Sequence, residues 1–153
     1  MATGDIIWFE EARTLDYFAG WAGTDDIKCA VFNNTGAPTA ADATPALADY
    51  VANEVTAAGT YVAGGTSLGD WATMWTEAGG TGKLDSATDP EWAADGSNAT
   101  DAYWAILYND TQTTPVADPC FAFVELGGPV DMQAGSLKIT WNVSNGIATL
   151  TAA

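Results

Sequence analysis

The amino-acid sequence predicts a mainly β, single-domain protein of the β-sandwich or jelly-roll type, with a short N-terminal helix. Two observations support this fold class. Short apolar segments recur along the chain, several of them with alternating side chains, and turns rich in glycine separate them. The 153 residues are 48% hydrophobic, which is enough to bury one core. We find no repeat and no linker, so residues 1–153 are expected to form one domain, with a helical segment at 1–23 and a β domain at 24–153.

The N-terminal segment is the one place where a helical period is visible. Between residues 6 and 23, Trp8, Ala12, Leu15 and Phe18 recur at spacings of three and four. This spacing predicts a short amphipathic helix that ends at a following glycine.

The next segments predict a strand and then a long loop. In "DDIKCAVFN", residues 25–33, Ile27, Cys29 and Val31 alternate with the residues of the opposite face. The stretch that follows, residues 34–49, is small, polar and contains prolines, which predicts a loop. Loops of this length in a compact domain tend to be functional or interfacial.

The rest of the chain predicts strands separated by turns. One prediction is that Trp71, Thr73 and Trp75 alternate along a single strand. A short strand is expected around Trp92 in an acidic loop, and "SNG" predicts a hairpin turn near the C-terminus. The segments with strand character are residues 53–65, 67–80, 102–110, 120–128 and 136–152.

The segment "AYWAILYNDTQTTP", residues 102–115, allows two interpretations. Its aromatic residues and aspartate suit a sugar-binding or hydrolytic cleft, but they also suit a buried strand that runs into a turn. Trp104, Ile106 and Tyr108 alternate with apolar residues on the other face, and Asn and Asp then favour a turn. We therefore expect the central strand of a sheet.

The charge of the chain excludes several classes of partner. Twenty acidic residues against four basic ones give a formal net charge of −16. Four scattered bases cannot neutralise a phosphate backbone, and an anionic membrane surface would repel the chain. We expect no nucleic acid and no membrane as partners, whereas a basic protein partner remains possible. Acidic residues near the start also predict that no secretory leader is present.

Little in the sequence predicts catalysis. The chain has no histidine, which removes the commonest general base and metal ligand, and it has no phosphate-binding or nucleophile motif. We expect no catalytic residue, no metal and no cofactor. Asp89, Glu91, Asp95 and Asp101 lie close enough in sequence for a glycosidase pair or a Ca²⁺ site. A solvated acidic loop is the favoured interpretation of these four residues.

The tryptophans and cysteines are mostly expected in the core. Seven tryptophans are many for this length, and Trp71, Trp75, Trp104 and Trp141 are expected to supply core area. The two cysteines, in "IKCAVF" and "PCFAFV", are best interpreted as small buried apolar residues. A bridge between neighbouring strands is the alternative for the cysteines.

The order of the segments resembles a family of small structural proteins of tailed-phage virions. The resemblance extends over residues 5–150, and the loops at 36–49 and 77–101 are longer than in the family pattern. Its most specific residues are Asn53-Glu54-Val55, Gly59, Tyr61, Gly64-Gly65, Tyr108-Asn109-Asp110-Thr111, Trp141 and Gly146-Ile147.

This resemblance implies a capsid decoration (cement) protein on the exterior of the virion head, made in the host cytoplasm. The implied partner is the major capsid protein, and a homotrimer is expected. Alternatives are a head-fibre, tail, baseplate or host-receptor-binding protein, and, third, a carbohydrate-binding or glycosidase-like β-sandwich. The residues predicted to contact the partner are Trp8, Phe9, Leu15, Phe18, Trp21, Pro38, Pro45 and Tyr50.

Overall fold

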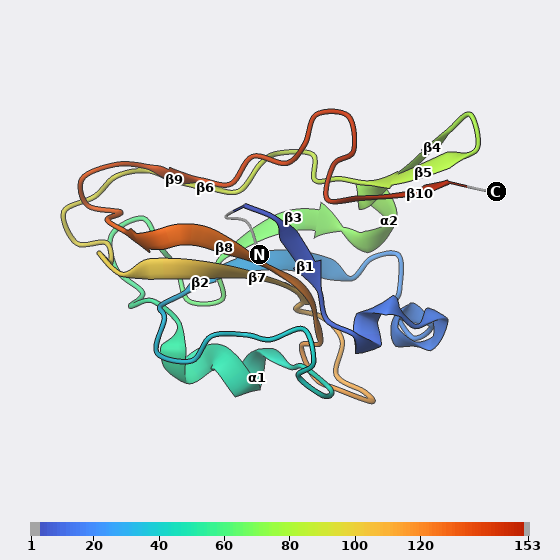
Figure 1. Cartoon of the computed structure of the whole chain (residues 1–153), viewed down its shortest axis with the longest axis horizontal. Coiled ribbons are helices and arrows are strands. Elements are labelled where there is room, and N and C mark those ends of the chain that lie inside the picture. Colours follow the sequence, from blue (N-terminus) through green and yellow to red (C-terminus); the bar gives the residue numbers. More distant parts are fainter. Residues whose placement is uncertain (1–3, 152–153) are drawn as a thin grey trace.

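Five antiparallel strands form the main sheet of this protein, whose computed structural model describes residues 4–151. The strand order is β1-β8-β7-β2-β3, so two strands from the second half of the chain lie between β1 and β2 (Figure 1). The prediction of a mainly β fold is confirmed. The strands of this sheet are β1 (Ile6–Trp8), β2 (Asp26–Phe32), β3 (Thr66–Asp70), β7 (Ala102–Asn109) and β8 (Cys120–Val130).

Strand β7 is the centre of this sheet, as its apolar sequence predicts. It pairs with β2 on one side and with β8 on the other, and seven of its eight residues are buried. Ile106 lies opposite Ala30 and Phe123, whereas the next residue, Leu107, lies opposite Cys29 and Ala122. Because successive side chains point to opposite faces, β7 contributes to the core on both sides of the sheet.

Further elements cover the two faces of this sheet (Figure 1). A three-stranded sheet, β10-β5-β4, and a two-stranded sheet, β6-β9, lie on one side, which we call the upper layer. Helix α1 (Leu47–Tyr50) and the chain around it lie on the other side. The remaining bounds are β4 (Trp75–Ala78), β5 (Thr81–Leu84), β6 (Glu91–Trp92), β9 (Leu137–Lys138), β10 (Ala148–Thr151), α2 (Trp71–Met74) and the 3-10 helices η1 (Glu11–Arg13), η2 (Leu15–Phe18) and η3 (Val51–Asn53).

The face below the sheet is filled mainly by aromatic rings. Phe123 packs against Phe9 with ring centroids 5.0 Å apart, and Phe9 in turn lies 6.1 Å from Tyr50 of α1. Tyr50 also contacts Phe32 of β2. Because all four rings are buried, apolar contacts hold α1 against the sheet. A helix of one turn would not be stable without such packing.

The N-terminal segment differs from a single amphipathic helix. Ile6 and Ile7 are β-branched and pair with Val124 and Phe123 of β8, so the chain starts as an edge strand. Helical structure follows only as the two short 3-10 helices η1 and η2. The spacing of three and four that predicts a helix is also compatible with these 3-10 turns.

One predicted strand, residues 53–65, is wrong, and another, residues 67–80, is interrupted by a helical turn between β3 and β4. Residues 54–65 form a loop that joins the sheet through a bridge between Glu54 and Phe32 and isolated hydrogen bonds rather than a strand ladder. Gly59, Gly64 and Gly65 have positive φ within it. Residues 71–74 form α2, because the backbone N–H of Trp71 bonds to Asp25 O, outside any sheet. The chain turns a corner there, from β3 to β4.

The predicted C-terminal hairpin is also wrong. Strand β9 pairs with β6, and β10 pairs with β5, so the two segments join different sheets. Within residues 4–151, a single bridge, between Asn142 and Gly146, links them near the "SNG" turn. The strands that pair with β9 and β10 lie far away in sequence. The residues of the local turn therefore give no information about this pairing.

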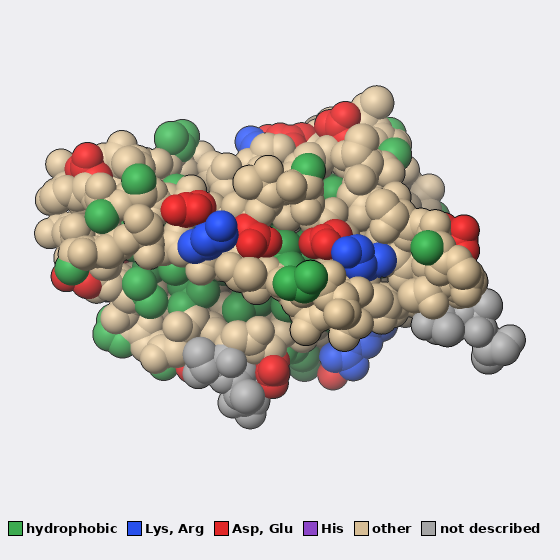
Figure 2. Space-filling view, turned by 90° about the horizontal axis from the view of Figure 1, so that it is seen from above, with side chains coloured by type: hydrophobic (Ala, Val, Ile, Leu, Met, Phe, Trp, Pro, Cys, Tyr) green, Lys and Arg blue, Asp and Glu red, His purple; other side chains and the backbone are tan. Residues whose placement is uncertain are grey.

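Among the described acidic and basic residues, only Asp25 is buried. The three lysines are paired with acids: Lys28 with Asp110, Lys83 with Asp85, and Lys138 with Glu91. Figure 2 shows the face of the upper layer, where basic side chains lie directly beside acidic ones. Pairs this exposed contribute little to stability, so their main effect is on the surface potential.

Candidate functional site

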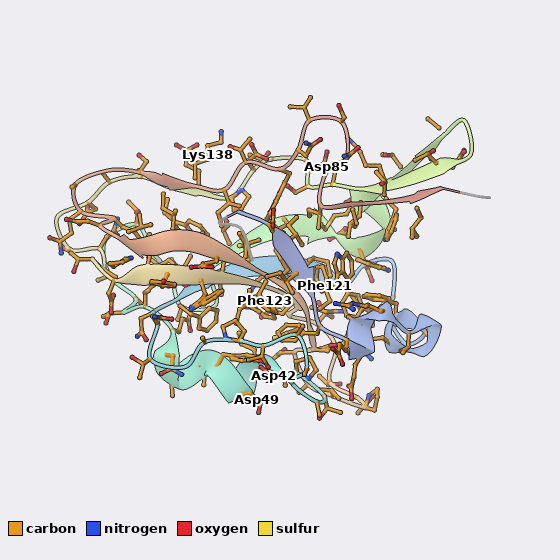
Figure 3. All side chains as sticks on the ribbon, in the orientation of Figure 1. Asp42, Asp49, Asp85, Phe121, Phe123 and Lys138 are labelled. Atoms are coloured by element: carbon orange, nitrogen blue, oxygen red, sulfur yellow. The ribbon has the colours of Figure 1, made fainter. Side chains whose placement is uncertain are left out.

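A cluster of aromatic side chains lies where the N-terminal turns meet the rest of the fold. Phe18 stacks on Trp71 with ring centroids 5.3 Å apart, and it meets Trp21 edge to face at 4.8 Å. Trp8 and Phe121 join the same cluster, 5.4 Å from each other. Phe121 belongs to β8 and lies on the side of the N-terminal turns, whereas Phe123 lies further along the sheet (Figure 3). The cluster therefore holds η2 against both β8 and α2.

A groove opens beside this aromatic cluster, with a volume of about 480 Å³. One wall is the N-terminal segment and the other is strand β10, and tryptophans of α2 and β4 lie between them. We call this site the aromatic groove. Its lining consists of Trp8, Ala12, Arg13, Thr14, Phe18, Trp71, Trp75, Ala148, Thr149 and Leu150.

The aromatic groove is mainly apolar and its lining contains no carboxylate. Arg13 is its only charged lining residue, and the guanidinium Nη2 donates a hydrogen bond of 3.1 Å to Trp8 O. A site of this composition can bind an apolar group by contact, but it offers no acid and base pair for hydrolysis.

The structure separates the predicted partner residues into two groups. Trp8 and Phe18 line the aromatic groove, and Trp21 packs against Phe18. The second group, Phe9, Pro38, Pro45 and Tyr50, is buried inside the chain and has little surface left for a partner. The side chain of Leu15 lies outside the described residues.

Sequence reasoning missed the opposite side of the aromatic groove. Trp71 and Trp75 were expected in the core, yet both are only half-buried. Their spacing of four residues is a signal that could have placed them on one side of a helical turn. The contribution of β10 was not predictable, because it depends on pairing with β5.

The motif residues of the resemblance mainly stabilise the fold. Glu54 Oε1 accepts hydrogen bonds from the Tyr61 hydroxyl, at 2.7 Å, and from the backbone N–H of Gly64, at 2.6 Å. The Tyr108 hydroxyl donates to Gly64 O at 2.8 Å. The Tyr108 bond fixes the 54–65 loop to strand β7, and a bond from the Val31 N–H to the Tyr61 hydroxyl fixes it to strand β2. Burial first, and then the charge of Glu54, raise the pKa of Tyr61 far above its usual value, so Tyr61 stays a donor.

Two glycines of this motif permit close backbone contacts. At Gly65, φ is +75°, and a Cβ would overlap Cys29 O. At Gly146, φ is +60°, and a Cβ would overlap Leu84 O. Only glycine tolerates both the conformation and the contact at these positions.

The four acids considered for catalysis or Ca²⁺ have separate local roles. Asp95 Oδ1 accepts a hydrogen bond from the N–H of Ser97, and Asp89 Oδ1 accepts one from Trp141. Glu91 pairs with Lys138, and Asp101 is exposed. Within residues 4–151, no group of three potential metal ligands is close enough to hold an ion.

Both cysteines are buried and free, as their apolar surroundings predict. Burial raises the pKa of the Cys29 thiol to about 12. Burial, together with the charges of Asp49 and Asp118, also raises the pKa of Cys120 well above its usual value. Thiols in this state are protonated and poorly reactive at neutral pH.

Comparison with protein-family models, with curated proteins and with solved structures found no match to this chain. In the described part of the chain, no helix has the length and apolar character that crossing a membrane requires.

Proposed function

We propose that this protein is a structural component of a tailed-phage virion, a decoration protein that attaches to the exterior of the head. The aromatic groove carries this proposal, because it presents apolar rings for binding without any converging acid and base. The sequence resemblance supplies the phage context, and it is the support for the major capsid protein as partner.

The proposed mechanism is mechanical. Many copies, arranged as homotrimers, would clamp neighbouring capsid subunits against the pressure of the packaged DNA. Each copy contributes a modest interface, and the total becomes large through multivalency. A net charge of −16 keeps free copies apart in solution before they attach.

The rigidity of the fold supports such a role. In the described part of the chain, each buried polar side-chain atom has a hydrogen-bond partner. Asn98, for example, donates to Ala93 O and to Met132 O, and it accepts from the backbone N–H of Thr60. A domain with a fully satisfied interior transmits load with little rearrangement.

Electron microscopy of purified particles tests the location. Uniform coverage of the head by this protein is the expected result. A few copies at one vertex, or copies confined to the tail, would support the head-fibre, tail or baseplate alternatives instead. Absence from the particles would contradict a virion role altogether.

A rebinding experiment tests the clamp. Purified protein is added to particles that lack it, and the temperature at which DNA is released is measured. We expect a rise that saturates with added protein, while an unrelated acidic protein of similar charge gives none. An unchanged release temperature despite saturating attachment would contradict the mechanical role.

A further inference from the structure

Strand β10 leaves one of its edges unpaired next to the aromatic groove. It is the outer strand of the sheet β10-β5-β4, and within residues 4–151 its only strand partner is β5. Ala148, Thr149 and Leu150 of this strand line the groove. Figure 1 shows β10 on the side of the sheet that faces the N-terminal turns.

The register shows which backbone groups of β10 point outward. The β4–β5 hairpin turns through Gly79-Gly80, so Ala78 and Thr81 form a hydrogen-bonded pair. Along β5 the direction alternates, and Gly82 and Leu84 therefore bond toward β10. It follows that the N–H and C=O groups of Thr149 point away from β5, toward open space.

This edge lacks the charged residues and the proline that often protect a free strand. Its four residues, "ATLT", contain no charge and no proline. By contrast, the opposite edge strand, β4, carries Glu77, and β3 ends in Gly69 and Asp70. An unprotected edge is a template for an added strand, because it offers backbone donors and acceptors in a row.

The side chains beside this edge form an apolar surface. Trp75, Gly82 and Leu150 share one face of the small sheet, and the Cβ position of Gly82 is 3.8 Å from the Trp75 ring and 3.9 Å from Leu150 Cβ. Leu150 is 65% exposed although its neighbours in the groove are apolar. An added strand would cover Leu150 with its alternate side chains.

Charge indicates what kind of segment fits. The chain has sixteen more acids than bases, and its three lysines are already paired with acids. Glu77 lies on the same face as Trp75, two residues further along β4. Arg13 lies on the opposite wall of the groove, so basic residues of a ligand are expected toward the end of the sheet that carries Glu77.

We propose that a basic, extended peptide segment of the partner protein adds to the free edge of β10 and places alternate apolar side chains in the aromatic groove. The backbone edge selects a polypeptide, the rings select apolar side chains, and the negative potential selects lysine or arginine. This inference rests on the proposed function, and it names the docking surface and the chemistry of the docked segment.

A display library of random twelve-residue peptides tests the inference directly. Binders are selected on the native protein, and their affinities are measured by fluorescence anisotropy. We expect the selected peptides to be rich in Lys or Arg alternating with apolar residues. Methylation of alternate backbone nitrogens in a selected peptide should weaken binding at least tenfold, because these N–H groups join the edge.

Two variants locate the binding site. Thr149→Pro removes the outward N–H of β10 while leaving the pairing with β5, and it should weaken binding about tenfold. Leu150→Ala should weaken it severalfold. Val143→Ala is the matched control, because Val143 is 90% exposed and does not line the groove. The affinity of this variant for the peptide should be unchanged.

The controls keep each outcome informative. Urea unfolding of all three variants checks that they are folded. If Thr149→Pro does not fold, the Leu150→Ala variant and the methylated peptide still test the inference. Failure to select any peptide, or selected peptides that bind all variants and the methylated form equally, would overturn the inference. Either of these results would leave the proposed attachment to particles uncontradicted. Conversely, absence of the protein from particles would contradict the proposed function but not the peptide site.

Discussion

Glu54 and Tyr61 are joined by a hydrogen bond of 2.7 Å between the Tyr61 hydroxyl and Glu54 Oε1. The same hydroxyl oxygen accepts a hydrogen bond of 3.0 Å from the backbone N–H of Val31. One side chain thus links the 54–65 loop to strand β2.

Removing this hydroxyl should destabilise the protein. Tyr61→Phe leaves the Val31 N–H without its partner, while Glu54 Oε1 keeps only the hydrogen bond from the Gly64 N–H. We expect a loss of about 1–3 kcal/mol in the free energy of unfolding. Urea denaturation measures it. Tyr103→Phe is the control, since Tyr103 is half-buried and should change stability by less than about 0.5 kcal/mol. Equal effects of the two substitutions would contradict the role given to Tyr61.

Two glycines with similar backbone angles should respond very differently to alanine. At Gly65 a Cβ would overlap Cys29 O, whereas at Gly79, with φ of +61°, nothing lies within 4 Å. Gly79→Ala should therefore cost only the strain of the left-handed conformation, about 1 kcal/mol. Gly65→Ala should cost several times more, or prevent folding. Thermal unfolding of both variants makes the comparison, and similar melting temperatures would refute it.

Asp118 should destabilise the protein at neutral pH. Burial, and then repulsion from Asp110, raise the pKa of Asp118, so its charged form is less favourable in the folded chain. The stability that depends on Asp118 is fully present below the pKa that this group has in the unfolded chain. It is lost as the pH rises through the higher pKa that the group has in the folded chain. Asp118→Asn should raise the unfolding free energy at pH 7, by about 0.5 kcal/mol or less because solvent screens the site. At pH 3 the gain should disappear.

Asp42 should show the opposite pH dependence. Partial burial opposes its ionisation, but hydrogen bonds from Thr39 and from the Tyr50 hydroxyl outweigh this, and the pKa of Asp42 is lowered. Its stabilising effect is present above the unfolded pKa and is lost as the pH falls through the folded pKa. Asp42→Asn should therefore destabilise at pH 7 and much less at low pH. A gain in stability at pH 7 would be inconsistent with this network.

The two thiols should be inert in the folded protein. Cys29 and Cys120 are buried, and the pKa of each thiol is raised. A chromogenic disulfide reagent should label neither at pH 7.5 and both after unfolding in urea, and a reducing agent should leave the melting temperature unchanged. Rapid labelling of the native protein would show that one of these strands opens easily.

The sequence predicts best the strands whose own residues are apolar enough to require burial. Strands β2, β7 and β8 are long apolar runs, and the central position of β7 follows from its two apolar faces. The 54–65 loop was mistaken for a strand because its buried residues, Val55 and Tyr61, bond to the sheet through a side chain and isolated backbone contacts rather than a ladder.

The candidate site was predictable only in part. Trp8, Phe18 and Trp21 could be selected because they recur on an N-terminal segment with few other roles. Phe9 could not be separated from them, since adjacent residues look alike in sequence although Phe9 faces the core. The wall formed by β10 depends on the pairing of β10 with β5, which is distant in sequence, and a local pattern does not encode this pairing.

The pairing of distant segments has a consequence for the order in which the protein folds. Residue 7 lies opposite residue 123, and residue 150 lies opposite residue 82. On the ribosome, β1 must wait until β8 has emerged, and β5 gains its second neighbour only after β10 has been made. Since long loops must close before these contacts form, we expect slow folding. During that wait, Leu84 and Trp75 are exposed to the cell, and chaperones that recognise apolar strands would find their target there.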